Sequence, residues 1–217
     1  MNRQTKEYVI FDSVTPQAVT SSTDASPSVV TKASHGLATN DRVLIYGHAT
    51  NTTINGIFDV VRVDANTFTL KDINTGTAIN GASGGAGTGG IVMTAPKIVS
   101  AEDFRHCVLY INTASSGNLT AKIAASLGKN LADQTALSGD TPNFGATVSD
   151  TNPYSFVAAI NLEDGAQVEG DTGFVVAGTD ATRTYEVNTN GLKYLTVVPT
   201  AWSAGAITVK AKLFNNS

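Results

Sequence analysis

The chain has 217 residues and a formal net charge of −4, a length that suits one large domain or two small domains with separate cores. Charged residues make up only 15% of it and include no run of Lys or Arg, which argues against a nucleic-acid track or a membrane-surface patch. No apolar run reaches the ~18 residues of a membrane span, and residues 1–12 lack the apolar core of a secretion signal. We expect a soluble protein built from two small β domains.

The apolar residues recur with a period of two along almost the whole chain, which predicts short β-strands. Turn-forming residues separate these segments, and Asn55-Gly56 and Asn190-Gly191 are expected to supply the positive φ of tight turns. Only residues 100–104, with Ser100 as N-cap, and residues 131–137 could form a helical turn. The pattern predicts an all-β protein with strands at 8–12, 28–33, 41–47, 56–63, 67–72, 90–94, 106–112, 118–126, 154–162, 173–178, 183–188, 192–199 and 206–214.

The stretch HGLATNDRVLIYG, residues 35–47, contains the residues that most resemble a catalytic site. A catalytic His35 would need an acid to orient it and a nucleophile to activate, and the sequence offers no recognisable nucleophile motif. The alternative is a surface turn through His35 that leads into a strand. In that strand Val43 and Ile45 point one way, and Leu44 and Tyr46 point the other way. We favour the turn.

The segment around this turn resembles a known family of small β modules. SHGLATNDRVLIYG is followed by INGIFDVVRVDANTFTL, and the whole match spans residues 29–72. It is similar to the module found in many tailed-phage virion proteins and named after a β domain of the ubiquitin-activating enzyme. The resemblance implies a barrel-like β fold and a virion setting. It implies no adenylation or thioester chemistry.

The glycine-rich stretch that follows matches a nucleotide-binding motif only in spelling. Gly85, Gly87 and Gly90 fit G-x-G-x-x-G, but they precede a predicted strand and do not open a helix, so no helix N-terminus would face a phosphate. We expect a flexible loop here, and a last strand that ends the small module near Pro96.

Residues 97–217 are predicted to form an antiparallel β-sandwich of about seven strands. Their final part resembles the C-terminal domains of phage structural proteins, in which an Asn-Gly-Leu-Lys turn precedes a core strand and a TAWSAGAITV hairpin closes the sheet. The N-terminal segment, residues 1–22, is apolar and extended, and we expect it to pair with this sandwich. The small module, residues 23–96, would then be an insertion.

Several residues could bind a metal ion or a glycan. Glu163, Asp164, Glu169 and Asp171 lie in neighbouring turns and offer hard oxygen ligands for calcium, but their spacing does not fit an EF-hand. A metal site of three histidines would have to combine His35, His48 and His106 from both domains, which we consider improbable. A glycan-binding site would use Trp202 or Tyr154.

The single cysteine, Cys107, lies within a predicted strand and should pack as a small buried hydrophobe. We therefore expect no catalytic, cofactor-binding or metal-binding residues, and a protein that is not an enzyme.

The resemblance to virion modules suggests a non-enzymatic structural protein of a tailed bacteriophage, assembled into the virion in the bacterial host cytoplasm. A short chain without portal-type helices or fibre repeats favours a capsid decoration, or cement, protein that binds the assembled head. The alternatives are a neck, tail or baseplate accessory protein, and a glycan-binding or receptor-binding module.

The expected partners are the major capsid protein or other virion proteins, and further copies of this chain. Residues 127–154 form a long predicted loop, which in a compact domain usually serves a contact. The open strand edges and few charges suggest broad uncharged contacts between subunits. A homotrimer would match the local threefold points of an icosahedral shell. We expect neither nucleic acid nor a membrane as a partner.

Overall fold

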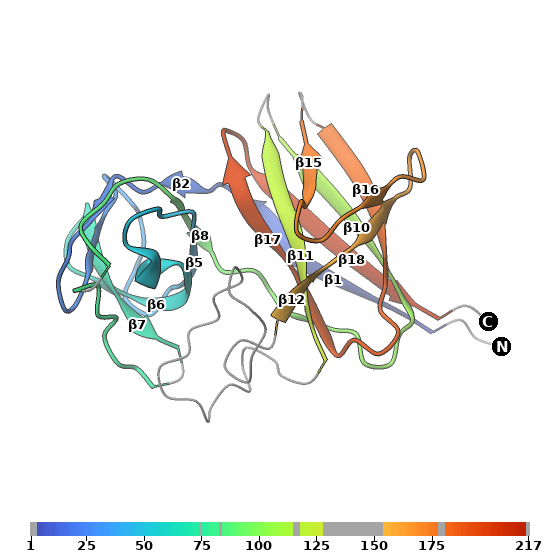
Figure 1. Cartoon of the computed structure of the whole chain (residues 1–217), viewed down its shortest axis with the longest axis horizontal. Coiled ribbons are helices and arrows are strands. Elements are labelled where there is room, and N and C mark those ends of the chain that lie inside the picture. Colours follow the sequence, from blue (N-terminus) through green and yellow to red (C-terminus); the bar gives the residue numbers. More distant parts are fainter. Residues whose placement is uncertain are drawn as a thin grey trace. The chain divides into compact units, whose positions relative to one another are not determined.

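The computed structural model describes residues 4–73, 75–82, 84–114, 118–127, 154–177 and 181–215, without the side chains of residues 154 and 181. In these residues the secondary structure is antiparallel β-sheet with one short 3-10 helix, η1 (Thr52–Ile54), so the predicted all-β class is confirmed (Figure 1). No helix among them has the length and apolar character needed to cross a membrane. Contacts divide the chain into a larger unit, with described residues within 4–15 and 96–215, and a small unit, Pro16–Ala95.

The larger unit contains a six-stranded sheet that buries one of its faces. In β18 the side chains of Ile207, Val209, Ala211 and Leu213 are buried, whereas the intervening Lys210 and Lys212 are exposed. This alternation is the period of two seen in the sequence. The strand order is β1 (Thr5–Val14), β18 (Ile207–Phe214), β10 (His106–Thr113), β16 (Ala181–Asn188), β13 (Ala159–Asn161) and β14 (Gln167–Val168).

A second sheet completes the β-sandwich of this unit. Phe174 in this sheet packs against Tyr185 of β16, with ring centroids 4.5 Å apart, and both side chains are buried. The strand order is β12 (Tyr154–Val157), β11 (Leu119–Ser126), β17 (Tyr194–Trp202) and β9 (Val99–Ser100), and β15 (Phe174–Val176) also pairs with β11.

Two of the predicted connections in the sandwich are wrong. Residues 154–162 were expected to form one strand, but β12 belongs to the five-stranded sheet and β13 to the six-stranded sheet, so the chain changes sheets at residue 158. TAWSAGAITV is not a hairpin, because β17 and β18 also lie in different sheets. The turn between them is held by Trp202 Nε1, which donates a hydrogen bond to the carbonyl of Gly205 at 2.8 Å.

The small unit is a single seven-stranded sheet that curls into a half-barrel. Its two edge strands, β2 and β3, are separated in the chain by only Val19 and Thr20. The N–H of Val19 donates to the Gly90 carbonyl at one edge of the sheet, and the N–H of Thr20 donates to the Thr31 carbonyl at the other edge. This short segment therefore connects the two edges. The strand order is β2 (Gln17–Ala18), β8 (Ile91–Thr94), β5 (Arg42–Tyr46), β6 (Gly56–Arg62), β7 (Thr67–Asp72), β4 (Val29–Thr31) and β3 (Ser21–Ser22).

The chain passes from one unit to the other between Thr15 and Pro16 and returns between Ala95 and Pro96. The N-terminal strand β1 pairs with β18 of the sandwich. The next residues, which the sequence analysis assigned to the same N-terminal segment, form β2 and β3 and pair with β8 and β4 of the small unit.

The core of the small unit contains Val43 and Ile45, the aromatic residues Phe58 and Phe68, and further aliphatic residues. Leu44, on the opposite side of β5, is also fully buried, and Tyr46 is half-buried. The strand phase inferred from the sequence therefore describes the side facing the core, but the other side of β5 is not a solvent-exposed face.

The prediction that His35 is a surface turn residue is wrong. Its side chain is 2% exposed. Nδ1 accepts a hydrogen bond from the Leu37 N–H at 3.0 Å, so Nε2 carries the proton and donates it to the carbonyl of Asp64, also at 3.0 Å. The ring edge contacts Phe68 at a centroid distance of 5.1 Å. His35 is thus a buried connector between two turns.

A second buried polar group organises the glycine-rich stretch. The amide of Asn51 is fully buried and donates to Ser28 Oγ at 3.1 Å and to the carbonyl of Thr23 at 3.3 Å. A Cβ on Gly87 would lie 2.5 Å from the Cβ of Thr50. The glycines therefore allow close packing against this turn, and the flexibility of the loop stays a prediction.

The predicted positive φ lies at Gly191 (84°) in the pair Asn190-Gly191 and at Gly56 (150°) in the pair Asn55-Gly56. Asn55 itself does not contribute it. Its backbone is extended, with φ −79°, and Gly56 begins β6. The Asn55 side chain instead accepts a hydrogen bond from the His48 N–H and donates one to the His48 carbonyl, both at 2.9 Å. The side-chain amide of Asn55 thereby takes the place of a backbone partner for the N–H and carbonyl of His48.

Replacing Ile45 with Asp should unfold the small unit, because an unpaired charge in its core costs several kcal/mol. Hydrogen exchange followed by mass spectrometry should show loss of protection in β5, β6 and β7, with protection in β10 and β18 retained. Val63→Asp, at a position that is 59% exposed in the same unit, is the matched control and should change little. A normally protected Ile45→Asp protein would contradict the strand phase.

Replacing His35 with Ala should destabilise the small unit by about 2–4 kcal/mol, since it leaves a cavity and removes the partners of the Leu37 N–H and the Asp64 carbonyl. Urea unfolding monitored by exchange in β7 measures this loss. Val63→Ala should stay within about 0.5 kcal/mol of the parent, as exposed substitutions usually do. If the two variants are equally stable, the result would contradict the burial of His35.

The stability of the small unit should fall as the pH drops below 6.5. Burial opposes the charged form of His48 and lowers its pKa from the usual 6.5, although the nearby Gly87 backbone acts in the opposite direction. The unfolded chain then binds more protons than the folded chain between the lowered pKa and 6.5, so acidification favours unfolding in that window. His48→Gln should lose this part of the pH dependence. An unchanged pH profile would contradict the assignment.

Candidate functional site

The stretch that most resembled a catalytic site in the sequence uses its polar residues for structure. Arg42 and Asp59 lie opposite each other on β5 and β6 and form a two-point ion pair, with N–O distances of 2.8 and 3.1 Å. The Asp41 carboxylate accepts the N–H of Ala38 at 2.8 Å and closes the turn. His35 is held between the two backbone groups described above.

The acidic turns do not converge on a common point. Asp164 accepts the N–H of Ala166 at 2.9 Å, and Glu169 accepts the side-chain amide of Gln167 at 3.1 Å. Glu163 lies 3.5 Å from the guanidinium of Arg183. Asp171 is exposed. Within the described parts of the chain, no group of three or more His, Cys, Asp or Glu residues could hold a metal ion.

The prediction that Cys107 is a buried strand residue is confirmed. It lies in β10 with no exposed surface, and burial raises the pKa of its thiol to about 12. A thiol with such a pKa is not a nucleophile at neutral pH.

The remaining residues singled out in the sequence belong to different elements of the fold. His106 stacks on Phe214 and contacts Glu186 at 2.9 Å, whereas the buried His48 belongs to the small unit. The indole of Trp202 is half-buried and bound to its own turn. The side chain of Tyr154 and residues 128–153, which include most of the predicted contact loop, lie outside the described residues.

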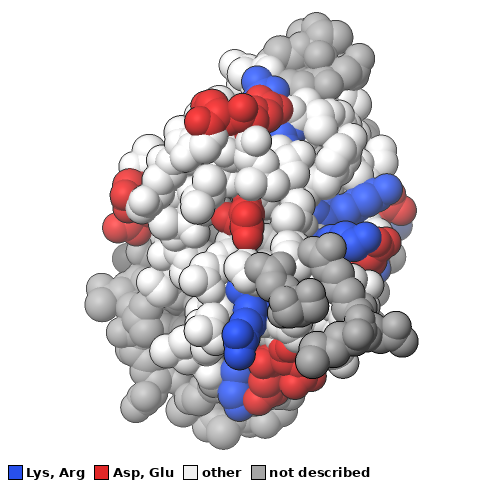
Figure 2. Space-filling view, turned by 90° about the vertical axis from the view of Figure 1, so that its right-hand side faces the viewer, with Lys and Arg blue, Asp and Glu red and all other residues white. Residues whose placement is uncertain are grey.

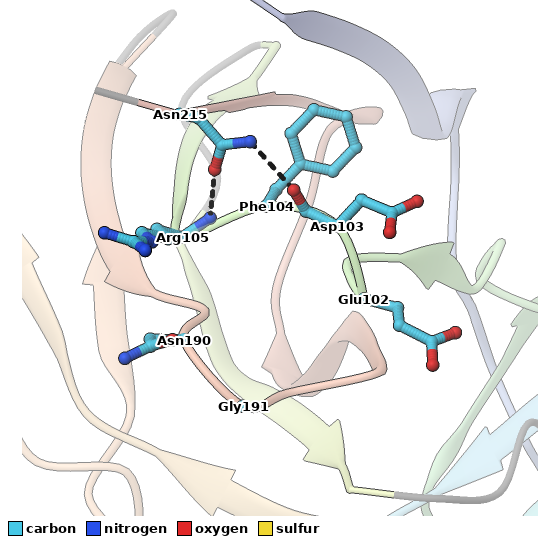
Figure 3. A pocket seen from close by; sticks show the side chains of 7 residues that line it. All are labelled: Glu102, Asp103, Phe104, Arg105, Asn190, Gly191 and Asn215. Carbon is cyan, nitrogen blue, oxygen red and sulfur yellow. Dashed lines mark hydrogen bonds between the residues drawn. The ribbon is translucent and has the colours of Figure 1, made fainter. Parts of the chain in front are cut away.

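A polar pocket of about 430 Å³ lies beside the start of β10 (Figure 3). Asn215 forms one wall. Its amide donates to the carbonyl of Asp103 at 2.8 Å and its oxygen accepts the N–H of Arg105 at 3.0 Å. The carboxylates of Asp103 and Glu102 point to one side, and the guanidinium of Arg105 points to the other.

This pocket could accept a polar ligand by hydrogen bonding. The seven lining residues include no Ser, Thr, Cys or His that a neighbouring base could activate. The Glu102 carboxylate is already paired with Lys193 at 3.1 Å. The Asn215 contacts connect the residue that follows β18 to the loop that precedes β10.

A second pocket, of about 460 Å³, lies on the outer face of the six-stranded sheet. Side chains that alternate with the buried core residues form its lining, among them Val108 and Tyr110 of β10 and Lys210 and Lys212 of β18. Lys212 bonds Glu7 at 2.9 Å, and this hydrogen bond lowers the pKa of the Glu7 carboxyl.

Several apolar side chains on this outer face of the sheet are strongly exposed. Tyr110 is 42% exposed, and Ile160 and Leu162 are each 46% exposed. Figure 2 shows the side of the molecule that faces right in Figure 1, where the charged residues form several groups on an otherwise uncharged surface. The alternation within HCVLYIN indicated that Val108 and Tyr110 share a side, but the sequence analysis did not identify this face as a site. Such a surface suits contact with another protein.

No family model and no curated protein sequence matches the chain. The resemblance of residues 29–72 to the module named after the ubiquitin-activating enzyme therefore has no support from a family model. Among solved structures, the chain is similar to the SPBc2 prophage-derived protein YomS, with 13% sequence identity and a TM-score of 0.37, over 55% of this chain and 79% of that chain. This is a weak structural likeness to a phage-derived protein.

Proposed function

We propose that this chain is a non-enzymatic structural protein of a tailed-phage virion, and that it decorates the assembled head by binding the major capsid protein. The observation that carries the proposal is the organisation of the small unit. Residues 29–72, which resemble the small modules of virion proteins, form β4 to β7 of one curled sheet. Their polar residues serve turns and ion pairs within that sheet, which is consistent with a contact module.

The polar pocket beside β10 supports a second candidate function, the binding of a glycan or receptor. Glu102, Asp103, Arg105 and Asn190 place both acceptors and donors around one cavity. Such a set can recognise hydroxyl groups, although Trp202, which would be a natural stacking platform, is engaged by its own turn.

Co-sedimentation with purified heads and purified tails of the encoding phage tests the proposal. The parent protein should sediment with heads, and mass spectrometry should find it in heads and not in isolated tails. Ile45→Asp, which we expect to unfold the small unit, should abolish this binding, whereas Val175→Asp, at a position 57% exposed in the larger unit, should preserve it.

Two outcomes would contradict head decoration, and a third would contradict only the assignment of the contact to the small unit. Binding to tails alone would indicate a neck, tail or baseplate role. Binding to a glycan array that is lost in Arg105→Ala, without binding to heads, would favour the receptor function. Head binding that survives Ile45→Asp would show that the small unit is not the contact module.

A further inference from the structure

The sequence contains three Asn-Gly pairs, Asn55-Gly56, Asn80-Gly81 and Asn190-Gly191. In such a pair the peptide nitrogen of the glycine can attack the side-chain amide carbon of the asparagine, because glycine has no Cβ to obstruct the approach and its backbone rotates easily. The attack requires that this nitrogen and the asparagine side chain can move, and that water reaches them. The three pairs differ in these respects.

The Asn55-Gly56 pair is held by both of its residues. The Asn55 side chain accepts the His48 N–H and donates to the His48 carbonyl, both at 2.9 Å. Gly56 is buried and pairs with Ile45 in the ladder between β5 and β6. An attack at this pair would have to break both contacts of the amide and open the end of the ladder.

The Asn80-Gly81 pair is held at the attacking nitrogen. The Gly81 N–H donates to the Ala25 carbonyl at 2.9 Å, and the side-chain oxygen of Asn80 accepts the Ala82 N–H, also at 2.9 Å. Gly81 is buried against Asn51, whose Nδ2 would lie 2.7 Å from a Cβ at this position. The nitrogen that would attack is therefore already bound and closely packed.

The Asn190-Gly191 pair is open. Both residues are exposed, and they occupy the central positions of a turn that the Leu192 N–H closes by donating to the Thr189 carbonyl at 2.9 Å. The Gly191 N–H and the Asn190 side-chain amide have no hydrogen bond to any residue that the structure describes. The pair also lines the polar pocket beside β10, so water has access to it (Figure 3).

We propose that Asn190 is a site of spontaneous deamidation. A base from the solvent removes the proton of the Gly191 peptide nitrogen, which attacks Cγ of Asn190 and forms a new N–Cγ bond. The Cγ–Nδ2 bond breaks, and the amide nitrogen takes up a proton and leaves as ammonia. Water then opens the five-membered imide, at Cγ to give aspartate or at the backbone carbonyl to give isoaspartate. The conversion consumes one water and releases one ammonia, without an oxidant or a reductant.

The modification changes the charge of the pocket. Its lining then contains a carboxylate at position 190 in addition to those of Glu102 and Asp103, and Arg105 is the cation among the described residues that line it. The isoaspartate form also adds one backbone atom to the turn between β16 and β17, which belong to different sheets. The pocket thus loses an amide donor and becomes more acidic. This inference does not depend on the virion assignment.

Peptide mapping by mass spectrometry, after incubation of the folded full chain, tests the proposal. Trypsin places the three pairs in separate peptides, residues 43–62, 72–97 and 184–193. Peptide 184–193 should gain about 1 Da, because the amide group is exchanged for a carboxyl group. After incubation in heavy-oxygen water and digestion in ordinary water, it should carry one heavy oxygen atom. Fragmentation should place the change at Asn190 and not at Asn188 in the same peptide.

The rates separate the effect of the fold from that of the motif. In the folded chain Asn190 should react at least about tenfold faster than Asn55 or Asn80, because those pairs must first break hydrogen bonds by local opening. In urea, which removes the fold, the three rates should agree within a few-fold. Asn190→Gln should abolish the change at position 190, since the longer side chain forms the cyclic imide far more slowly. Asn188→Gln, the matched control, should deamidate at Asn190 like the parent.

An Asn190 that stays intact in the folded chain while the urea-unfolded chain reacts would overturn the proposal. So would equal rates at the three pairs of the folded chain, a change located at Asn188, or a product without heavy oxygen. Thermal unfolding followed by Trp202 fluorescence verifies that the incubated protein is folded. Failure of head binding in the earlier experiment, with deamidation at Asn190 observed, would reject the proposed function but leave this site standing.

Discussion

The ladder between β1 and β18 is the constraint on which the rest of the molecule depends. It pairs Thr5 with Phe214 and, after two irregularities in register, Val14 with Ile207. Because β18 also pairs with β10, the ladder connects the first strand of the chain to the middle of the six-stranded sheet. The chain leaves this unit after Thr15, directly beyond the ladder, and returns to it at Pro96.

Buried polar side chains have a comparable role in the small unit. His35, Asn51 and Asn55 replace backbone hydrogen bonds where the chain turns and the strand ladder is interrupted. A buried polar group without such partners would cost a few kcal/mol, so each residue is compatible with burial only in this arrangement. His35, which looks chemically reactive in the sequence, therefore has a structural role in the fold.

The sequence predicted strand positions well because one face of most strands is buried, which imposes a period of two. All thirteen predicted segments contain strand. The four strands that were missed, β2, β3, β9 and β14, have two residues each and are too short to show a period. The division of residues 154–162 between two sheets was not predictable either, since alternation reports which side of a strand is buried and not which neighbour it pairs with.

The candidate surfaces were harder to predict than the strands. Tyr110, Lys210 and Leu162 belong to different segments of the sequence, and only the strand registers align them in one row. The burial of His35 was not predicted for a similar reason, because a turn has the same sequence whether or not another turn covers it. Cys107 was predicted correctly because Val108, Leu109 and Ile111 mark an apolar strand around it, so the local pattern was sufficient.

The pairing of β1 with β18 also brings the two ends of the described chain together, since the Asn215 N–H donates to the Gln4 carbonyl and both ends lie at the same side in Figure 1. A short linker between these ends would convert the ladder with the greatest sequence separation in the molecule into a hairpin. The entropic cost of closing a loop grows with its length, and folding is slower when contacts are distant in sequence. A circularly permuted chain would therefore keep the same architecture and form the larger unit faster.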